Sequence, residues 1–238
     1  MTDPTPLSTT RGADRPRGHS GTSDTELAIF AATERLLASE PLHDLSVAQL
    51  IAEAGISRAT FYFYFSSKFA VVVGLLAQVM DEIFEVVQPF VRRQEDVSPE
   101  QALHESLEAA IGLWARHRPA LRAIHEHWST TDELRDLWVG IVGRFTEAIA
   151  VELDRERASG LAPAGADSRS VAAALLWGTE RVLYVAGLGV DPSFPDESAA
   201  LSPLMTMWIG TLYGGRSAIP SEPASRQRGP RRRSSDKG

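Results

Sequence analysis

The sequence predicts an all-α protein, in which an N-terminal helix-turn-helix domain of three helices is joined by one long helix to a larger C-terminal helical domain. Apolar residues recur at helical spacing along most of the chain, and no segment alternates apolar and polar residues as a half-buried strand would. Capping residues such as Ser, Thr and Asp stand before the apolar runs. With 238 residues, 43% of them hydrophobic, the chain can bury a sizeable core. We expect about nine helices from these signals.

Composition restricts both the compartment and the chemistry. Cysteine is absent, so neither disulfides nor thiolates are available. The chain has no charged-then-apolar leader and no run of 18 apolar residues, so we expect a cytoplasmic protein without a membrane span. The net charge of -7 is unusual for a DNA-binding protein, because affinity for DNA depends mainly on neutralised phosphates.

The two ends of the chain differ from its middle in composition. Residues 1–22 are rich in Thr, Pro, Ser and Gly, and residues 215–238 are rich in arginine, so we expect two disordered tails. Their basic side chains are either solvated or add a sequence-independent attraction to DNA. Between the tails we place the helix-turn-helix domain at residues 23–67 and the larger domain at residues 68–214.

The first two helices have clear boundaries in the sequence. The first is expected over residues 25–39, after a cap at Ser23 or the following aspartate, and Pro41 ends it. Ser46 caps the second helix, whose apolar residues fall at i, i+3 and i+4. Gly55 ends it, because glycine tolerates the positive φ that a helix terminus requires.

The third helix is expected over residues 58–65, after a cap at Ser57. Phe61 and Phe65 are four residues apart and therefore share the face that meets the core. The opposite face carries no carboxylate, which suits a DNA groove and its phosphates. It consists of Arg58, Ala59, Thr60, Tyr62 and Tyr64.

The stretch at residues 55–68, GISRATFYFYFSSK, resembles the helix-turn-helix signature of the TetR family of bacterial transcriptional regulators. The resemblance extends from about residue 26 to residue 214. It implies that Thr60 and Tyr62 meet DNA, that Tyr64 and Lys68 contact phosphates, and that Arg58 and Ala59 occupy base-reading positions. The DNA-binding candidates are Ser46, Ser57, Arg58, Ala59, Thr60, Tyr62, Phe63, Tyr64 and Lys68.

The chemistry of two of these side chains matches base edges. Arg58 can bind guanine O6 and N7 with two hydrogen bonds, and the Ala59 methyl can meet a thymine methyl. The alternative for Tyr62 and Tyr64 is that they only cover the core of the domain. Phe63 can face either the core or the DNA.

The long helix is expected over residues 67–88, with Pro89 at its end. It is apolar on nearly all sides, so we expect it to be buried on several faces. At 1.5 Å per residue it spans about 30 Å. In the family that the chain resembles, the equivalent helix connects the DNA-binding domain to the ligand-binding domain and carries motion between them.

Five further helices follow, each with its own start or stop signal. Ser98 and Pro99 start one of them, with Gln101 placed for a capping box. Thr130 and Glu133 form the pattern of a second capping box. The expected spans are residues 99–117, 119–128, 131–159, 167–188 and a last helix within 196–213. This order matches the family architecture, in which the last two helices form the dimer interface.

All five tryptophans lie beyond the long helix, where they either pack an ordinary core or line an apolar tunnel. The resemblance favours a ligand pocket, because Trp138 and Trp208 match pocket tryptophans of family members. Thr179 stands where those members have an asparagine that bonds ligand carbonyls, so we expect a different ligand preference. The candidates are Ala110, Trp114, Trp138, Val142, Phe145, Leu176, Thr179 and Trp208.

Other polar residues give no sign of catalysis or metal binding. His125 and His127 are two residues apart and do not share a helix face, so we expect no metal and no other cofactor. No catalytic motif is present, which argues against an enzyme. Glu180 and Arg181 lie in an apolar helix and need partners, either across a dimer seam or within their own neighbourhood.

The sequence therefore predicts a homodimeric TetR-type repressor. It would bind a palindromic double-stranded DNA operator and leave it when a hydrophobic small-molecule effector binds. One alternative is an all-α small-molecule-binding protein that no longer binds operators, since residues 22–70 carry more carboxylates than cations. A transcriptional activator is another.

Overall fold

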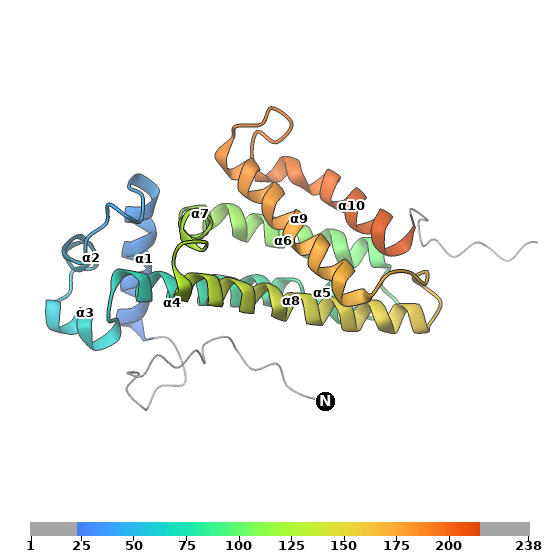
Figure 1. Cartoon of the computed structure of the whole chain (residues 1–238), viewed down its shortest axis with the longest axis horizontal. Helices are drawn as coiled ribbons and strands as arrows, with labels where there is room; N and C mark the ends of the chain where they lie inside the picture. The colour runs from blue at the N-terminus through green and yellow to red at the C-terminus, as the bar shows by residue number, and fades with distance from the viewer. Residues whose placement is uncertain (1–22, 215–238) are drawn as a thin grey trace, which may run out of the picture.

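The computed structural model describes residues 23–214. Our expectations of disorder and DNA attraction for residues 1–22 and 215–238 lie outside these described residues. Figure 1 shows the N-terminal helices at one end of the molecule, the bundle of later helices at the other, and α4 running from the first part into the second. The expected all-α fold is confirmed for the described part, which contains no named strand.

The helix-turn-helix domain consists of α1 (Asp24–Ser39), α2 (Val47–Ala54) and α3 (Arg58–Tyr64). Ser23 and Ser46 each form a reciprocal capping box with the residue three positions later. Gly55 has a φ of 65°, the left-handed conformation that ends α2. The expected boundaries of these helices therefore hold to within one residue.

The long helix α4 (Lys68–Val86) ends two residues earlier than expected. The backbone breaks at Val87, and a single turn, α5 (Gln88–Val91), carries Pro89 at its second position. Proline is tolerated there because the first N–H groups of a helix have no internal partner. This extra turn raises the count to ten α-helices and one 3₁₀ helix among residues 23–214.

The remaining elements form the larger domain. They are α6 (Pro99–Arg116), α7 (Arg118–His127), α8 (Asp132–Ala158), α9 (Ser168–Leu188), the 3₁₀ helix η2 (Glu197–Ala200) and α10 (Leu201–Tyr213). Helix α8 packs most extensively on α9, whereas α6 contacts α4, α5 and α10. The side chains between these helices form the walls of the cavity described below.

Two expected capping boxes are absent. Ser98 does accept a hydrogen bond from the Gln101 backbone, but the Gln101 side chain donates to Glu105 instead of returning to the cap. Thr130 caps nothing, because its hydroxyl donates to the carbonyl of His127 in the turn that closes α7. Thr131 is the residue at the start of α8, and it makes no side-chain cap.

Helix α9 alone among residues 23–214 is long and apolar enough to cross a membrane, by length and composition only. Inside this fold it packs on α8, α7 and α10. Of its most apolar stretch, 28% is fully buried. Most of its other apolar side chains, such as Val171 and Val182, are half-buried against the core, and Leu188 at its end is exposed.

Candidate nucleic-acid interface and ligand cavity

Helix α3 is held by its two ends and one buried face. Ser57 caps it by accepting from the Thr60 backbone N–H at 3.0 Å, and the two hydroxyls lie 2.7 Å apart. Phe61 is fully buried, and the ring of Phe65 packs 5.6 Å from the ring of Phe30 on α1. Ser57 and Phe61 thus fix the rotation of α3 about its axis, which decides the side chains that point outward.

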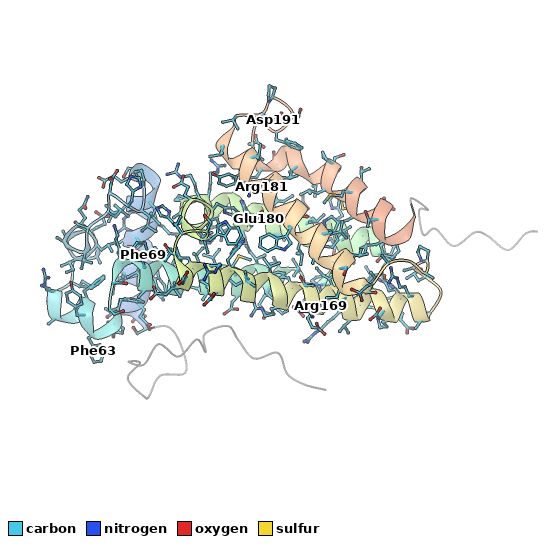
Figure 2. All side chains as sticks on the ribbon, viewed as in Figure 1. Phe63, Phe69, Arg169, Glu180, Arg181 and Asp191 are labelled. Carbon is cyan, nitrogen blue, oxygen red and sulfur yellow. The ribbon has the colours of Figure 1, made fainter. Side chains whose placement is uncertain are left out.

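The outward face contains most of the predicted DNA-binding residues. Arg58 and Ala59 are exposed, and Tyr62 and Phe63 remain 46% and 57% exposed. Figure 2 shows Phe63 pointing away from the body of the protein, which places it on the outward side and not in the core. Tyr64 is half-buried and packs partly against the core. The alternative of a pure core-covering role therefore does not fit Tyr62, whose ring lies 5.4 Å from the Arg58 guanidinium.

Lys68 has a different environment from the other candidates. Its ammonium group donates to the carbonyls of Leu42, His43 and Leu45 at 2.9, 3.0 and 2.7 Å. An ammonium has three N–H donors, so all are used by the loop between α1 and α2. A phosphate contact would require one of these hydrogen bonds to be given up. In this structure Lys68 ties the loop to the start of α4.

We expect Lys68→Met to destabilise the protein by about 1.5–3 kcal/mol, because three partly buried or exposed hydrogen bonds from a charged donor are lost. Urea unfolding measures this. If Lys68 has no phosphate contact, the slope of log DNA affinity against log salt concentration should be the same in the variant as in wild type. A slope that is smaller by about one per contact would show that Lys68 does contact a phosphate. Arg35→Met is the control, since its exposed pair with Glu53 contributes less than about 1 kcal/mol.

The acidic residues of the domain lie off α3 and are largely engaged. Glu53 pairs with Arg35 at 2.6 Å, Glu40 accepts from Gln49 at 2.8 Å, and Glu34 contacts His117 at 2.6 Å. Arg58, by contrast, has no ion pair within residues 23–214. Ser46 is exposed at the start of α2, where unpaired backbone N–H groups favour an anion. The domain is acidic in sum, but its outward α3 face is not.

A second feature is an apolar cavity within the larger domain, with about 770 Å³ of space that no atom fills, its mouth included. Helices α4, α5, α6, α8, α9 and α10 supply its walls. All eight predicted ligand-binding residues line it: Ala110, Trp114, Trp138, Val142, Phe145, Leu176, Thr179 and Trp208. A mostly apolar space with a few polar groups in its wall is typical of small-molecule sites.

The polar atoms in the wall are few. Thr179 Oγ1 accepts a hydrogen bond from Trp208 Nε1 at 2.9 Å, so its own O–H remains free to donate to a ligand. Ser106 Oγ and Trp138 Nε1 are buried and have no hydrogen-bond partner within the described residues. Buried polar atoms without partners are rare in proteins. These two atoms are therefore available to a ligand or to water.

Ser106 and Glu180 are the polar wall residues that the sequence did not single out as ligand candidates. Helical spacing contains the signal for Ser106, since it lies four residues before Ala110 and eight before Trp114 on the same face of α6. Glu180 has its partner within its own subunit, which was one of the two expected alternatives, but this partner is not Arg181. Its carboxylate contacts His125 on α7, and Arg181 is exposed, with its guanidinium 5.3 Å from the Tyr184 ring.

Helix α7 joins the cavity to the helix-turn-helix domain. It packs against α1, α4 and α9. At its start, His117 Nδ1 lies 2.6 Å from Glu34 Oε1 of α1, and His117 Nε2 lies 3.8 Å from Glu82 Oε2 of α4. The Arg122 guanidinium donates to the Leu37 carbonyl at 3.3 Å. These contacts cross the boundary between the two domains.

The hydrogen bond to Glu34 raises the pKa of His117, against the opposing effect of burial, and the charges of Glu34 and Glu82 raise it further. Arg116 lowers this pKa by a smaller amount. A raised pKa means that the folded protein binds a proton more tightly than the unfolded chain does. The resulting stabilisation is fully present below the ordinary pKa of 6.5 and is lost as the pH rises through the folded value.

We therefore expect Glu34→Gln to cost about 1–3 kcal/mol of unfolding free energy at pH 5.5, where the histidine is charged, and less at pH 9. Urea unfolding at several pH values measures the difference between wild type and variant. Glu126→Gln is the matched control, because Glu126 pairs with Arg122 on the surface of α7. A Glu34→Gln difference that grows with pH would show that the assigned sign is wrong.

Residues 23–214 contain no group of three or more His, Asp or Glu side chains that could hold a metal ion. His125 and His127 instead contact backbone carbonyls one turn earlier through Nδ1, at 2.7 and 2.9 Å.

Comparison with known families matches two parts of the chain. Residues 29–74 match the family described as "Bacterial regulatory proteins, tetR family". Residues 103–214 match "Transcriptional regulator EthR, C-terminal domain". The first match covers α2, α3 and the start of α4, and the second covers most of the helices around the cavity.

Individual proteins extend this similarity. The HTH-type transcriptional regulator EthR of Mycobacterium tuberculosis H37Rv is 34% identical over 204 residues, covering 86% of this chain and 92% of that protein. The EthR of Mycolicibacterium smegmatis is 30% identical over 216 residues, covering 90% and 97%. Among solved structures, the SmeT-triclosan complex has a TM-score of 0.69 at 18% identity, covering 84% and 97%.

Proposed function

Because the chain belongs to the TetR family of HTH-type transcriptional regulators, we propose that it is a homodimeric repressor that binds a palindromic operator and is released by a hydrophobic small molecule. The observation that carries the proposal is the joint presence of an outward α3 face and an apolar cavity in one helical body.

DNA binding rests on α3. Arg58 offers two parallel N–H donors for a guanine edge, Ala59 a methyl group, and Tyr62 a phenol at the same exposed face. Ser46 at the start of α2 adds backbone N–H groups for a phosphate. We assign Thr60 a supporting role, since its hydroxyl already contacts Ser57. We propose residues 23–67 as the DNA-binding domain.

The dimer rests on α9 and α10, the last two helices. Their apolar side chains that the subunit leaves only half-buried include Val182 on α9 and Met205 and Ile209 on α10. A two-fold axis through this surface would bury the same residues of both copies against each other. Such a dimer can present two α3 helices to two major-groove segments about 34 Å apart on one face of the DNA, which is why we propose a palindromic operator.

Release rests on the connection between the cavity and α1. Helix α4 lines the cavity through Met80 and Ile83 and packs on α1 at its other end. Helix α7 contacts the cavity residue Glu180 through His125 and contacts α1 through His117. A ligand that fits one arrangement of these helices better than another shifts the spacing of the α3 pair by its difference in affinity. Residues 68–214 are thus proposed as the ligand-binding and dimerisation domain.

The test uses fluorescence anisotropy with DNA from upstream of the protein's own gene, together with sedimentation to determine the number of subunits. We expect a dimer that binds this DNA with falling affinity as salt increases and releases it when an apolar ligand is added. A monomer in solution, or a ligand that binds without any change in DNA affinity, contradicts the mechanism.

The main rival is an all-α small-molecule-binding protein without operator binding. The engaged ammonium of Lys68 and the acidic balance of residues 22–70 favour it. Operator selection from random DNA separates the two, because the rival enriches no sequence. An activator would bind the same operator, and a reporter gene under that operator distinguishes it from a repressor.

A further inference from the structure

The α7 end of the cavity is more polar than the rest of its wall. Trp114 and Trp138 line this end with their ring centroids 6.5 Å apart. The imidazole of His125 packs against both, at 5.7 and 5.4 Å, and stacks on Tyr184 at 4.7 Å. Glu180, labelled in Figure 2, brings its carboxylate to the same imidazole from α9.

Trp138 provides an unused donor at this end. The residue is 1% exposed, and its Nε1–H has no hydrogen-bond partner within residues 23–214. An indole N–H can only donate, so the group that satisfies it must be an acceptor. Leaving such a buried donor unpaired is unfavourable. A ligand acceptor that bonds to it therefore gains more binding free energy than one that bonds to a donor facing water.

Glu180 and His125 provide the matching acceptor. His125 Nδ1 lies 2.7 Å from the Leu121 carbonyl, which can only accept, so Nδ1 carries a hydrogen. The other nitrogen, Nε2, faces Glu180 Oε1. Nε2 itself makes no hydrogen bond within the described residues, so this contact with the imidazole does not occupy the carboxylate as a hydrogen-bond acceptor. The carboxylate of Glu180 has no other polar partner within the described residues, which leaves Oε2 to accept from a ligand.

The wall also restricts the charge that the ligand can carry. Glu180 is the one charged residue in the wall of this cavity. An anionic head group would lie beside the carboxylate without a counter-charge, and an ammonium head group could not accept from the Trp138 N–H.

We propose that Trp138 and Glu180 form a head-group subsite for a neutral ligand group that both accepts and donates a hydrogen bond, such as a primary amide or an alcohol. The inference rests on the proposed function in one respect, namely that the cavity is a ligand site. It adds the chemical class of the ligand: an apolar body with one neutral donor–acceptor group at the α7 end.

The test is a binding cycle with three probes that share one apolar body: 4-phenylbutanamide, 4-phenylbutanoate and butylbenzene. Calorimetry measures each dissociation constant for wild type, Trp138→Phe and Glu180→Gln. Trp138→Phe keeps a ring but removes the N–H, so we expect the amide to bind about tenfold more weakly and butylbenzene to change less than about twofold. In Glu180→Gln, the ratio of the 4-phenylbutanoate dissociation constant to the 4-phenylbutanamide dissociation constant should fall at least about tenfold, because the like charge of Glu180 is removed.

Trp177→Phe is the matched control, because Trp177 stacks on Trp128 at 5.9 Å and is not part of the cavity wall. It should leave all three dissociation constants unchanged. The subsite is refuted if Trp138→Phe weakens the amide and butylbenzene by the same factor, or if wild type binds the carboxylate as tightly as the amide. Butylbenzene separates the two proposals. If it does not bind wild type at all, the cavity is not a ligand site and both fall; if it binds and the head groups make no difference, only the subsite falls.

Discussion

Arg58→Ala should weaken operator binding by at least about thirtyfold while leaving the fold intact. Each good bidentate contact to a base is worth about 1–3 kcal/mol of discrimination, and a dimer loses two of them. Arg58 is exposed at the start of α3 and has no ion pair within residues 23–214, so its removal leaves no buried group unsatisfied. Fluorescence anisotropy with the selected operator, at fixed salt, measures the effect.

The variant also separates base reading from simple charge attraction. If Arg58 reads guanine, the variant should lose preference at one base position in each half-site and keep most of its non-specific affinity. Arg135→Ala is the matched control, because Arg135 is a partly exposed arginine at the start of α8 that pairs with Asp132. Equal losses for the two variants, or an unchanged base preference for Arg58→Ala, would leave Arg58 with no reading role.

Glu156→Ala should destabilise the protein strongly, by about 3–5 kcal/mol. Glu156 is 1% exposed and accepts from Arg93 Nε at 2.8 Å and from the Tyr213 hydroxyl at 2.5 Å. Burial and the hydrogen bond to this carboxylate raise the pKa of Tyr213. Removing the carboxylate leaves the guanidinium of Arg93, itself 8% exposed, without its counter-charge.

Urea unfolding of three proteins checks this value. Tyr213→Phe removes one hydrogen bond and keeps the ion pair, so we expect about 1–2 kcal/mol. Glu147→Ala is the surface control, since its pair with Arg169 is 62% exposed on both sides and should contribute less than about 1 kcal/mol. If Glu156→Ala is no worse than Tyr213→Phe, the Arg93 guanidinium has found another partner and the buried pair is not what holds α8 to the loop between α5 and α6.

The sequence was most informative where a structure depends on neighbours within one helical turn. Ser23, Ser46 and Ser57 cap their helices as expected, because a cap involves only a side chain and a backbone N–H two or three residues away. The same signal was wrong at Thr130, where the hydroxyl turns back to His127. A capping pattern in the sequence does not determine whether the side chain bonds to the helix that follows or to the turn that precedes it.

The residues that line the cavity could be predicted from the sequence, but the polar contacts that they make could not. Helical spacing and resemblance gave all eight expected residues, since residues on one face of a helix meet the same space. The partner of Glu180 was not predictable, because His125 comes from a different helix, 55 positions earlier in the numbering, and only the packing of α7 on α9 brings the two together. The same holds for His117 and Glu34, which are 83 residues apart.

By itself the sequence determined the all-α fold, the helix boundaries, the outward face of α3 and the family, since each follows from local spacing or from a contiguous motif. Only the tertiary structure decided what three charged groups do. Lys68 holds a loop 23–26 residues away, Glu180 contacts His125 of another helix, and Glu156 neutralises a buried arginine 63 residues away. The physical reason is that a charge or a hydrogen-bond donor acquires its role from the partner that packing provides, and packing joins segments that no local pattern connects.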